Sequence, residues 1–200
     1  MQNSLAIALA WPNTKCKQAG AWYDAPANLL GIAKDNYYKV GHSALILVQP
    51  DTKECLYFDF GRYHAPFGRG RVRDIYTDHE LKINTKAEMD KKLVLLNFQD
   101  IINEIQLKPE CHGDGKLYAS STPVNFNKAF KRAKKLQDKG SLIYGPFTLK
   151  GTNCSRFTRS VLFNGVTSNW LKLKLTFTRT LSPSPMRIVK TLKNVKSSTV

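Results

Sequence analysis

The chain has 200 residues, of which 42% are hydrophobic and 10% aromatic, and it carries a formal net charge of +16. This length and composition are typical of one globular domain with a single core and do not fit an intrinsically disordered chain. No apolar run approaches the roughly 18–20 residues that a helix needs to cross a bilayer, so we expect no membrane-spanning helix.

The first predicted element is a buried strand over residues 5–10, which Trp11 and Pro12 end. The same stretch does not fit a signal peptide, because no basic residue precedes it and Trp11-Pro12 interrupts it where a cleavage site should follow. Without a secretion signal, we expect a cytoplasmic protein.

The remaining elements follow from apolar periodicity and from turn residues. In chain order they are a short helix over 27–32, strands over 37–48 and 55–60, short strands over 72–76 and 80–83, a helix over 98–107, a basic amphipathic helix over 124–139, a broken strand over 141–149, a helix within 151–163 and an amphipathic strand over 171–177. The turn at residues 50–53 predicts a hairpin between the strands on either side of it. No repeat or second domain is evident, so residues 1–190 are predicted to form one domain and residues 191–200 a basic tail.

Residues 61–73 are dense in Gly, Arg and aromatic side chains. Such a composition is typical of a functional loop, although Gly and Pro alone would give the same pattern. Tyr63 and His64 in this segment are therefore additional candidate site residues.

The four cysteines are Cys16, Cys55, Cys111 and Cys154. In a chain of this size without a secretion signal, free thiols are expected rather than disulfides. Their spacing contains no CxxC pair, so we predict no metal site and no cofactor. Cys55 and Cys111 fit a packed core thiol and a loop thiol.

The positive charge is concentrated in the last third of the chain. Residues 128–200 hold sixteen basic residues and one acidic residue, whereas residues 1–127 are nearly balanced. A field of this size attracts anionic partners such as nucleic acid or acidic surfaces. Without aromatic residues interleaved in basic motifs, a solvated basic face is favoured over nucleic-acid binding.

Cys154 has the local setting of a reactive thiol. It follows Thr152 and Asn153, either of which can cap a helix, and it precedes Phe157 and Val161 at helical spacing. The first turn of a helix favours a thiolate, because free backbone N–H groups and the helix dipole stabilise negative charge there. Such a cysteine also needs a base, and an imidazole is the usual one.

Four histidines could supply that base. His42 follows Gly41 at the start of an apolar strand, whereas His79 and His112 lie among polar residues in apparent loops. His64 lies in the Gly/Arg-rich segment and is a candidate second site histidine. A single histidine on a strand is more often a structural residue than a catalyst, so His42 alone is weak evidence.

Gly41-His42 opening an apolar strand, followed by Asn153-Cys154-x-x-Phe157 opening a helix, resembles the circularly permuted NlpC-type branch of the papain-like fold, which includes lecithin retinol acyltransferase-like enzymes. The resemblance covers under a quarter of the chain and implies an α+β fold with an antiparallel sheet packed against helices. It also implies Cys154 as nucleophile, His42 as base, and a third residue that orients the imidazole from the next strand. Asp59 is the choice for that residue and His64 the alternative; Asp59 could equally be a strand-end residue bonded to the following turn.

Cys16 is the rival nucleophile, because it precedes His42 in the order of unpermuted relatives. Against it, Gly20 and Pro26 disrupt any amphipathic helix after Cys16.

The sequence therefore predicts a thiol hydrolase or acyltransferase that acts on a peptide, amide or ester through an acyl-enzyme. An acidic substrate is the first to test, because Cys154 lies in the basic third of the chain. The alternatives are a papain-like domain that binds without turnover and a basic protein that binds nucleic acid or acidic surfaces. The oligomeric state does not follow from the sequence.

Overall fold

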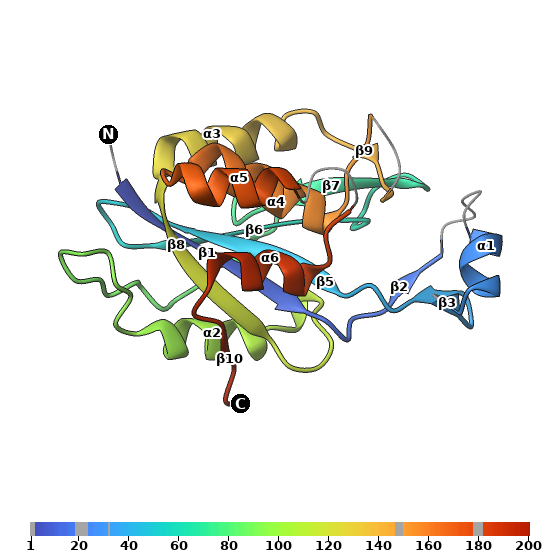
Figure 1. Ribbon diagram of the computed structural model, residues 1–200, viewed down its shortest axis with the longest axis horizontal. Helices are drawn as coiled ribbons and strands as arrows, with labels where there is room; N and C mark the ends of the chain where they lie inside the picture. The colour runs from blue at the N-terminus through green and yellow to red at the C-terminus, as the bar shows by residue number, and fades with distance from the viewer. Residues whose placement is uncertain (1–2, 19–23, 32, 147–149, 178–181) are drawn as a thin grey trace.

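The computed structural model describes residues 3–18, 24–31, 33–146, 150–177 and 182–200, and an antiparallel sheet forms its centre (Figure 1). The seven strands of this sheet are β1 (Asn3–Trp11), β5 (His42–Val48), β6 (Cys55–Gly61), β7 (Arg69–Arg73), β8 (Tyr118–Asn125), β9 (Leu142–Ile143) and β10 (Lys196–Ser197). They lie in the order β10-β8-β1-β5-β6-β7-β9, and all their pairings are antiparallel.

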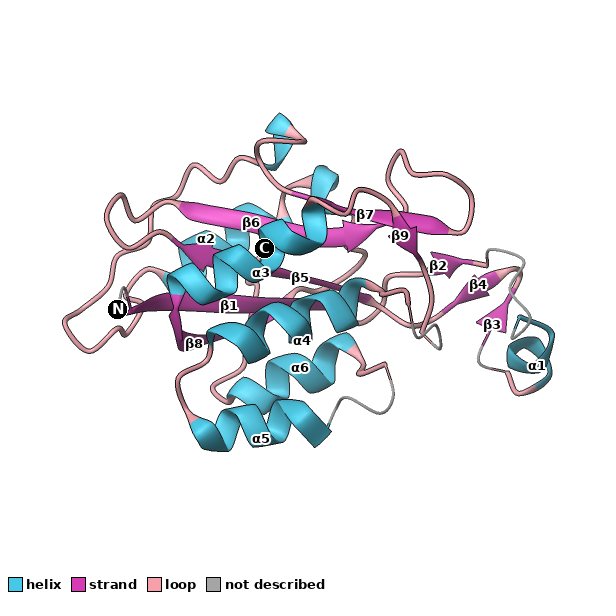
Figure 2. Ribbon diagram, turned by 90° about the horizontal axis from the view of Figure 1, so that it is seen from above, coloured by secondary structure: helices cyan, strands magenta, loops and turns pink. Residues whose placement is uncertain are grey.

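Helices cover both faces of the sheet (Figures 1 and 2). They are α2 (Phe98–Gln106) on one face, and α3 (Phe126–Gln137), α4 (Cys154–Gly165), α5 (Asn169–Phe177) and α6 (Pro185–Leu192) on the other. Two short 3₁₀ helices, η1 (His79–Leu81) and η2 (Pro109–Cys111), lie in the connections. No helix in the described ranges is long and apolar enough to cross a membrane.

A small three-stranded sheet extends from one end of the main sheet. It consists of β2 (Cys16–Lys17), β3 (Ala33–Lys34) and β4 (Tyr37–Tyr38) in the order β2-β4-β3, beside the short helix α1 (Asp24–Leu29). In Figure 1 this unit projects to the right of the main sheet. It places Cys16 close to the end where β5 begins, because Gly41 donates its backbone N–H to Thr14.

The alternation of side chains along β1 explains the two-layer packing. Leu5, Ile7, Leu9 and Trp11 pack on the α2 side, whereas the intervening alanines pack under α3, α4 and α6. Successive residues of a strand point to opposite faces, so one strand supplies both cores. The small alanine side chains allow the helical layer to lie close to the sheet.

The prediction of an α+β fold with an antiparallel sheet packed against helices is confirmed. The strand over 5–10, the hairpin partner over 55–60, the helix over 98–107 and the helix at Cys154 are also confirmed. The predicted strand over 37–48 is divided into β4 and β5, because Gly41 takes a left-handed conformation with φ +74°.

Several expectations are wrong. Residues 80–83 were expected as a strand but overlap η1, and residues 171–177 were expected as a strand but lie in α5. The basic helix begins at Phe126 rather than at 124, because the preceding residues form β8, which the sequence did not predict. The expected tail over 191–200 completes α6 and supplies β10, which pairs with β8.

Candidate functional site

Cys154 is the first residue of α4. The side chain of Asn153 caps this helix by accepting a hydrogen bond from the backbone N–H of Arg156 at 2.9 Å, and its amide donates to Ser182 Oγ at 2.5 Å. The backbone N–H groups of Cys154 and Ser155 have no acceptor among the hydrogen bonds of the described residues. The thiol therefore lies at the positive end of the helix, as the local sequence predicts.

His42 is the first residue of β5 and is 7% exposed. The preceding position, Gly41, requires glycine, because a Cβ there would lie only 2.8 Å from the carbonyl oxygen of Trp11. The Trp11 ring stacks on the imidazole with ring centres 5.7 Å apart. The strand start and the indole together fix the position of the ring.

Asp59 lies in β6, where it is fully buried and opposite Ala44 of β5. Because side chains alternate along a strand, His42 and Ala44 share one face of the sheet with Asp59. The Nε2 atom of His42 lies 3.5 Å from Asp59 Oδ2, which is close enough for an ion pair and long for a hydrogen bond. The structure thus brings Asp59 and His42 together.

The Cys154 thiol completes this centre beside His42. Cys154 and His42 lie close enough for each to shift the pKa of the other, and the backbone N–H of Ser43 also lowers the pKa of the thiol. Because Nε2 faces Asp59, Nδ1 is the imidazole nitrogen left for the thiol. The three side chains meet where β5 and α4 both begin.

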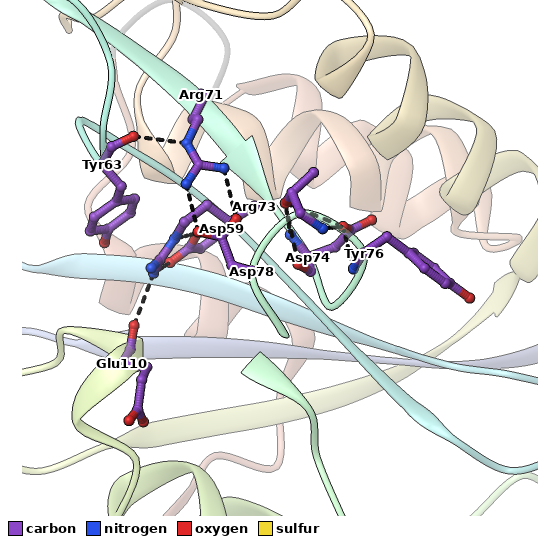
Figure 3. A network of polar contacts seen from close by, with 9 residues as sticks. Asp59, Tyr63, Arg71, Arg73, Asp74, Tyr76, Asp78 and Glu110 are labelled. Carbon is purple, nitrogen blue, oxygen red and sulfur yellow. Dashed lines mark hydrogen bonds and ion pairs between the residues drawn. The ribbon is translucent and has the colours of Figure 1, made fainter. Parts of the chain in front are cut away.

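Arg73 of β7 clamps Asp59 from the other side (Figure 3). Its Nε donates to Asp59 Oδ1 at 3.0 Å and its Nη2 to Oδ2 at 2.6 Å, while Nη2 also donates to the carbonyl of Glu110 at 3.0 Å. The guanidinium carbon lies 3.5 Å from the centre of the Tyr63 ring. A bidentate pair of this kind fixes the carboxylate in position and orientation.

A second arginine holds the loop that carries Tyr63. Arg71 donates its Nε to the Tyr63 carbonyl at 2.8 Å and pairs with both carboxylate oxygens of Asp78, at 2.7 and 2.5 Å (Figure 3). The Tyr63 ring in turn stacks on His112 with centres 4.8 Å apart. Tyr63 therefore supports Arg73, and no hydrogen bond within the described part of the chain connects its side chain to the thiol or the imidazole.

The charges of the three central groups support one another. Burial lowers the pKa of His42, but its interactions with the Asp59 carboxylate and the Cys154 sulfur outweigh burial and raise the pKa to about 9. Burial raises the pKa of Cys154, but the hydrogen bond and positive charge of His42 outweigh it and lower the pKa below that of an ordinary thiol. The pKa of Asp59 is also lowered, because His42 and Arg73 outweigh its burial. This favours a thiolate beside an imidazolium.

Cys16, the rival thiol, lies in β2 and is partly exposed. Its sulfur lies 3.7 Å from the Tyr144 hydroxyl and accepts from Arg62 Nη2 at 3.5 Å. The structure records no interaction of Cys16 with a histidine among the described residues. Cys16 is therefore a neighbour of the centre and lacks its own base.

The other candidate residues lie apart from the thiol. His64 is exposed and has φ +47°, in the turn after β6, and the structure records no contact between it and His42 among the described residues. Cys55 and Cys111 are buried free thiols, and burial raises the pKa of each to about 12. Within the described ranges, no group of three or more His, Cys, Asp or Glu side chains is placed to hold a metal ion.

Trp11 and Arg73 are site residues that the sequence did not predict. A signal for Arg73 was present, because a buried carboxylate requires a cationic or hydrogen-bonding partner and Arg73 lies on the predicted neighbouring strand. Nothing in the local pattern pointed to Trp11 as the residue under His42.

The basic excess of the last third lies mainly on the solvent side of the helical layer. A groove of about 500 Å³ between α5 and α6 is lined by Lys174, Arg187 and Lys190 together with Phe177 and Met186. In α4, Arg156 donates to the carbonyl of Gly145 and Arg159 to that of Leu175, at 3.4 and 3.2 Å. These two arginines of α4 therefore bind backbone carbonyl groups.

Comparison with known proteins gives two matches. The family model described as "Type VI secretion system effector TseH-like" matches residues 6–170. The crystal structure of the type VI secretion system effector TseH superimposes with a TM-score of 0.58 and 15% sequence identity, covering 98% of each chain. At this identity the structural likeness shows the fold alone. None of the curated proteins compared with the chain matches it.

These matches correct two expectations. The resemblance to the permuted NlpC-type, lecithin retinol acyltransferase-like branch is wrong, and the TseH-like family replaces it. The two motifs behind it are short, and any thiol site needs a cysteine at a helix start and a nearby base, so they do not distinguish families. The expected cytoplasmic location is also wrong, because a type VI secretion effector is delivered to target cells. The interpretation of residues 5–10 as a strand bears only on export by a signal peptide and not on delivery by a secretion system.

Proposed function

Because the chain belongs to the TseH-like family of type VI secretion system effectors, we propose that it is a thiol hydrolase that cleaves an amide or ester bond in a target cell. One observation carries this proposal: a cysteine at a helix start, a histidine at a strand start and a buried aspartate form one connected chain, in which the pKa of the thiol is lowered. Connected groups with perturbed pKa values are typical of nucleophilic sites.

The reaction begins from the ion pair in which His42 already holds the proton of the Cys154 thiol. The thiolate sulfur then attacks the substrate carbonyl carbon, and the carbonyl electron pair moves to its oxygen. When that intermediate collapses, the C–N or C–O bond breaks, and the imidazolium gives its proton to the leaving amine or alcohol. A thioester on Cys154 remains. Water, deprotonated by His42, hydrolyses it to a carboxylic acid and restores the thiol.

The backbone at the start of α4 is suited to stabilise the oxyanion. The N–H groups of Cys154 and Ser155 are among the first of the helix, and the helix itself does not use them. Donors of this kind stabilise negative charge as it develops on a carbonyl oxygen. The N–H of Cys154 is the first candidate donor because it belongs to the attacking residue.

Asp59 acts through His42 rather than on the substrate. Its carboxylate faces Nε2 and leaves Nδ1 to the thiol, so it sets which imidazole nitrogen carries the reaction. Arg73 and Tyr57 hold that carboxylate, the latter through a hydroxyl 3.3 Å from Oδ2. Asp59 is therefore a positioning residue for His42.

Alkylation tests the nucleophile directly. Iodoacetamide at neutral pH, followed by mass mapping of peptides, should modify Cys154 faster than Cys55 or Cys111. Cys154→Ala should remove that modification and leave the fold intact, and Cys16→Ser should keep it. If the fast-reacting thiol maps to Cys16 in the wild type, Cys154 is not the nucleophile.

Growth tests the activity in a cell. The chain is expressed from a repressible promoter in a bacterial host, once without an export signal and once directed to the periplasm. In the compartment that holds the substrate, the wild type should slow growth, while Cys154→Ala and His42→Gln at equal abundance should not. Slowed growth that survives Cys154→Ala would contradict hydrolysis through this thiol.

A further inference from the structure

Arg62, the residue after β6, is a half-buried cation that contacts Cys16 and the Tyr144 ring. Only its Nη2 is used within the described residues, where it donates to Cys16 Sγ at 3.5 Å and to the carbonyl of Lys17. No carboxylate in the described part of the chain lies within ion-pair distance of Arg62, whereas Arg71 and Arg73 each pair with an aspartate. The N–H groups on Nε and Nη1 are thus available to a ligand.

Tyr144 connects Arg62 to the start of α4. The guanidinium carbon of Arg62 lies 5.4 Å from the centre of the Tyr144 ring, and the Tyr144 hydroxyl lies 3.7 Å from Cys16. The same ring stacks on Phe60 at 5.9 Å, and Phe60 stacks on Phe157 of α4 at 6.4 Å.

The backbone gives a second connection between Tyr144 and the thiol. Tyr144 forms a parallel bridge with Thr152, and the backbone N–H of Gly145 donates to the Thr152 carbonyl at 3.1 Å. Thr152 lies two residues before Cys154. Burial, followed by the negative charge of Cys154, raises the pKa of Tyr144, so this hydroxyl stays protonated and can donate.

We propose that Arg62 and Tyr144 form a subsite for a carboxylate group of the substrate, next to the bond that Cys154 attacks. A guanidinium binds a carboxylate through two parallel N–H groups, and a neutral phenol adds a third donor. The substrate class is therefore an amide or ester with a free carboxylate close to its scissile carbonyl. This inference rests on Cys154 as the proposed nucleophile. It assigns the binding of an acidic substrate group to Arg62, in the turn after β6, rather than to the basic last third of the chain.

Two small alkylating agents test the subsite without knowledge of the substrate. Iodoacetate and iodoacetamide are similar in size and react with the same thiolate, but only iodoacetate carries a carboxylate. The measured quantity is the rate constant of iodoacetate divided by that of iodoacetamide at Cys154. Peptide mapping in a Cys16→Ser background gives both rate constants. A variant that changes the pKa of the thiol affects both rates alike, so the ratio isolates the binding of the carboxylate.

Arg62→Gln should lower this ratio by about threefold to tenfold, as expected for the loss of one nearby, partly screened charge. Arg62→Lys should retain much of the ratio, and Tyr144→Phe should lower it less than Arg62→Gln does. The matched control is Arg69→Gln, which removes the same charge from a residue that donates to the Ser141 carbonyl instead.

The outcomes separate the two proposals. If Cys154 reacts with both agents and the ratio in Arg62→Gln equals that of the background protein, the carboxylate subsite is wrong and the thiol site stands. An equal fall in Arg69→Gln would also overturn the subsite, because the effect would then be a general field. If neither agent modifies Cys154, both proposals fail.

Discussion

Arg73 and Asp59 form a buried bidentate ion pair, with Nε to Oδ1 at 3.0 Å and Nη2 to Oδ2 at 2.6 Å. Asp59 therefore faces His42 as a carboxylate whose charge is already partly compensated and whose orientation is fixed. The strand pairing explains this geometry, because Asp59 lies opposite Arg73 in the ladder between β6 and β7.

Removing Arg73 should destabilise the fold strongly. Arg73→Met leaves the Asp59 carboxylate buried without its cation, and loss of one partner of a buried pair costs about 3–5 kcal/mol in the free energy of unfolding. Urea denaturation of the wild type and variant measures this loss. Arg71→Met is the control, because it breaks the more exposed pair with Asp78 and should cost about 1 kcal/mol. Equal losses in the two variants would mean that Asp59 does not depend on Arg73.

Replacing Asp59 should lower the pKa of the His42 imidazole. Asp59→Asn removes a negative charge from Nε2, so the pKa of His42 should fall from about 9 toward its ordinary range. NMR titration of the His42 ring measures the change directly. Asp78→Asn removes the same charge from the Arg71 pair and should leave the pKa of His42 unchanged. A pKa of His42 that stays near 9 in Asp59→Asn would remove the positioning role of Asp59.

The rate of Cys154 alkylation should depend on pH in a way that His42 controls. In the wild type, the lowered pKa of Cys154 means that the thiolate, and hence the rate, rises at a lower pH than for an ordinary thiol. In His42→Gln, the stabilising charge is lost and burial still disfavours the thiolate, so the midpoint should move above the ordinary value. Iodoacetamide rates from about pH 5 to about pH 10, a range that brackets the pKa of an ordinary thiol, give both midpoints. Coincident midpoints would exclude a pair between Cys154 and His42.

Part of the site could be predicted from local sequence. The capping residue and the apolar spacing place Cys154 at a helix start, and both are local properties of Asn153, Phe157 and Val161. The pairing of His42 with Asp59 depends on the register between β5 and β6, which only the assembled sheet provides. Arg62 and Tyr144 are 82 positions apart in the sequence, and no local pattern relates them.

In β8 and α5, tertiary packing determines a structure that the local sequence pattern did not predict. Strand β8 is rich in Ser and Thr and contains Pro123, which lowers its strand signal. Pro123 is tolerated because β10 pairs only with Tyr118 and Ala119, so Pro123 lies beyond the β10 ladder. In α5, the alternation of Leu and Lys suggested a strand. Only Leu175 of this segment is buried, and the segment forms a helix that packs against α4 and α6.

The cap of α4 should control the reactivity of Cys154. Asn153→Ala removes the acceptor of the Arg156 N–H, which should cost about 1 kcal/mol in the free energy of unfolding and weaken the helix start that stabilises the thiolate. Iodoacetamide labelling of Cys154 should therefore slow at neutral pH, while Asn153→Ser, which keeps a cap, should restore most of the rate.

The matched control is Ser184→Ala. Ser184 caps α6 in the same way, by accepting from the Arg187 N–H at 3.2 Å, so its loss should destabilise the fold by a similar amount. Among the described residues, the recorded hydrogen bond of the Ser184 side chain goes to Arg187 and not to α4, so the labelling rate of Cys154 should stay at the wild-type value. If Ser184→Ala slows labelling as much as Asn153→Ala does, the slower rate reflects general loss of stability. A slower rate in Asn153→Ala alone means that the start of α4 sets the charge state of the thiol.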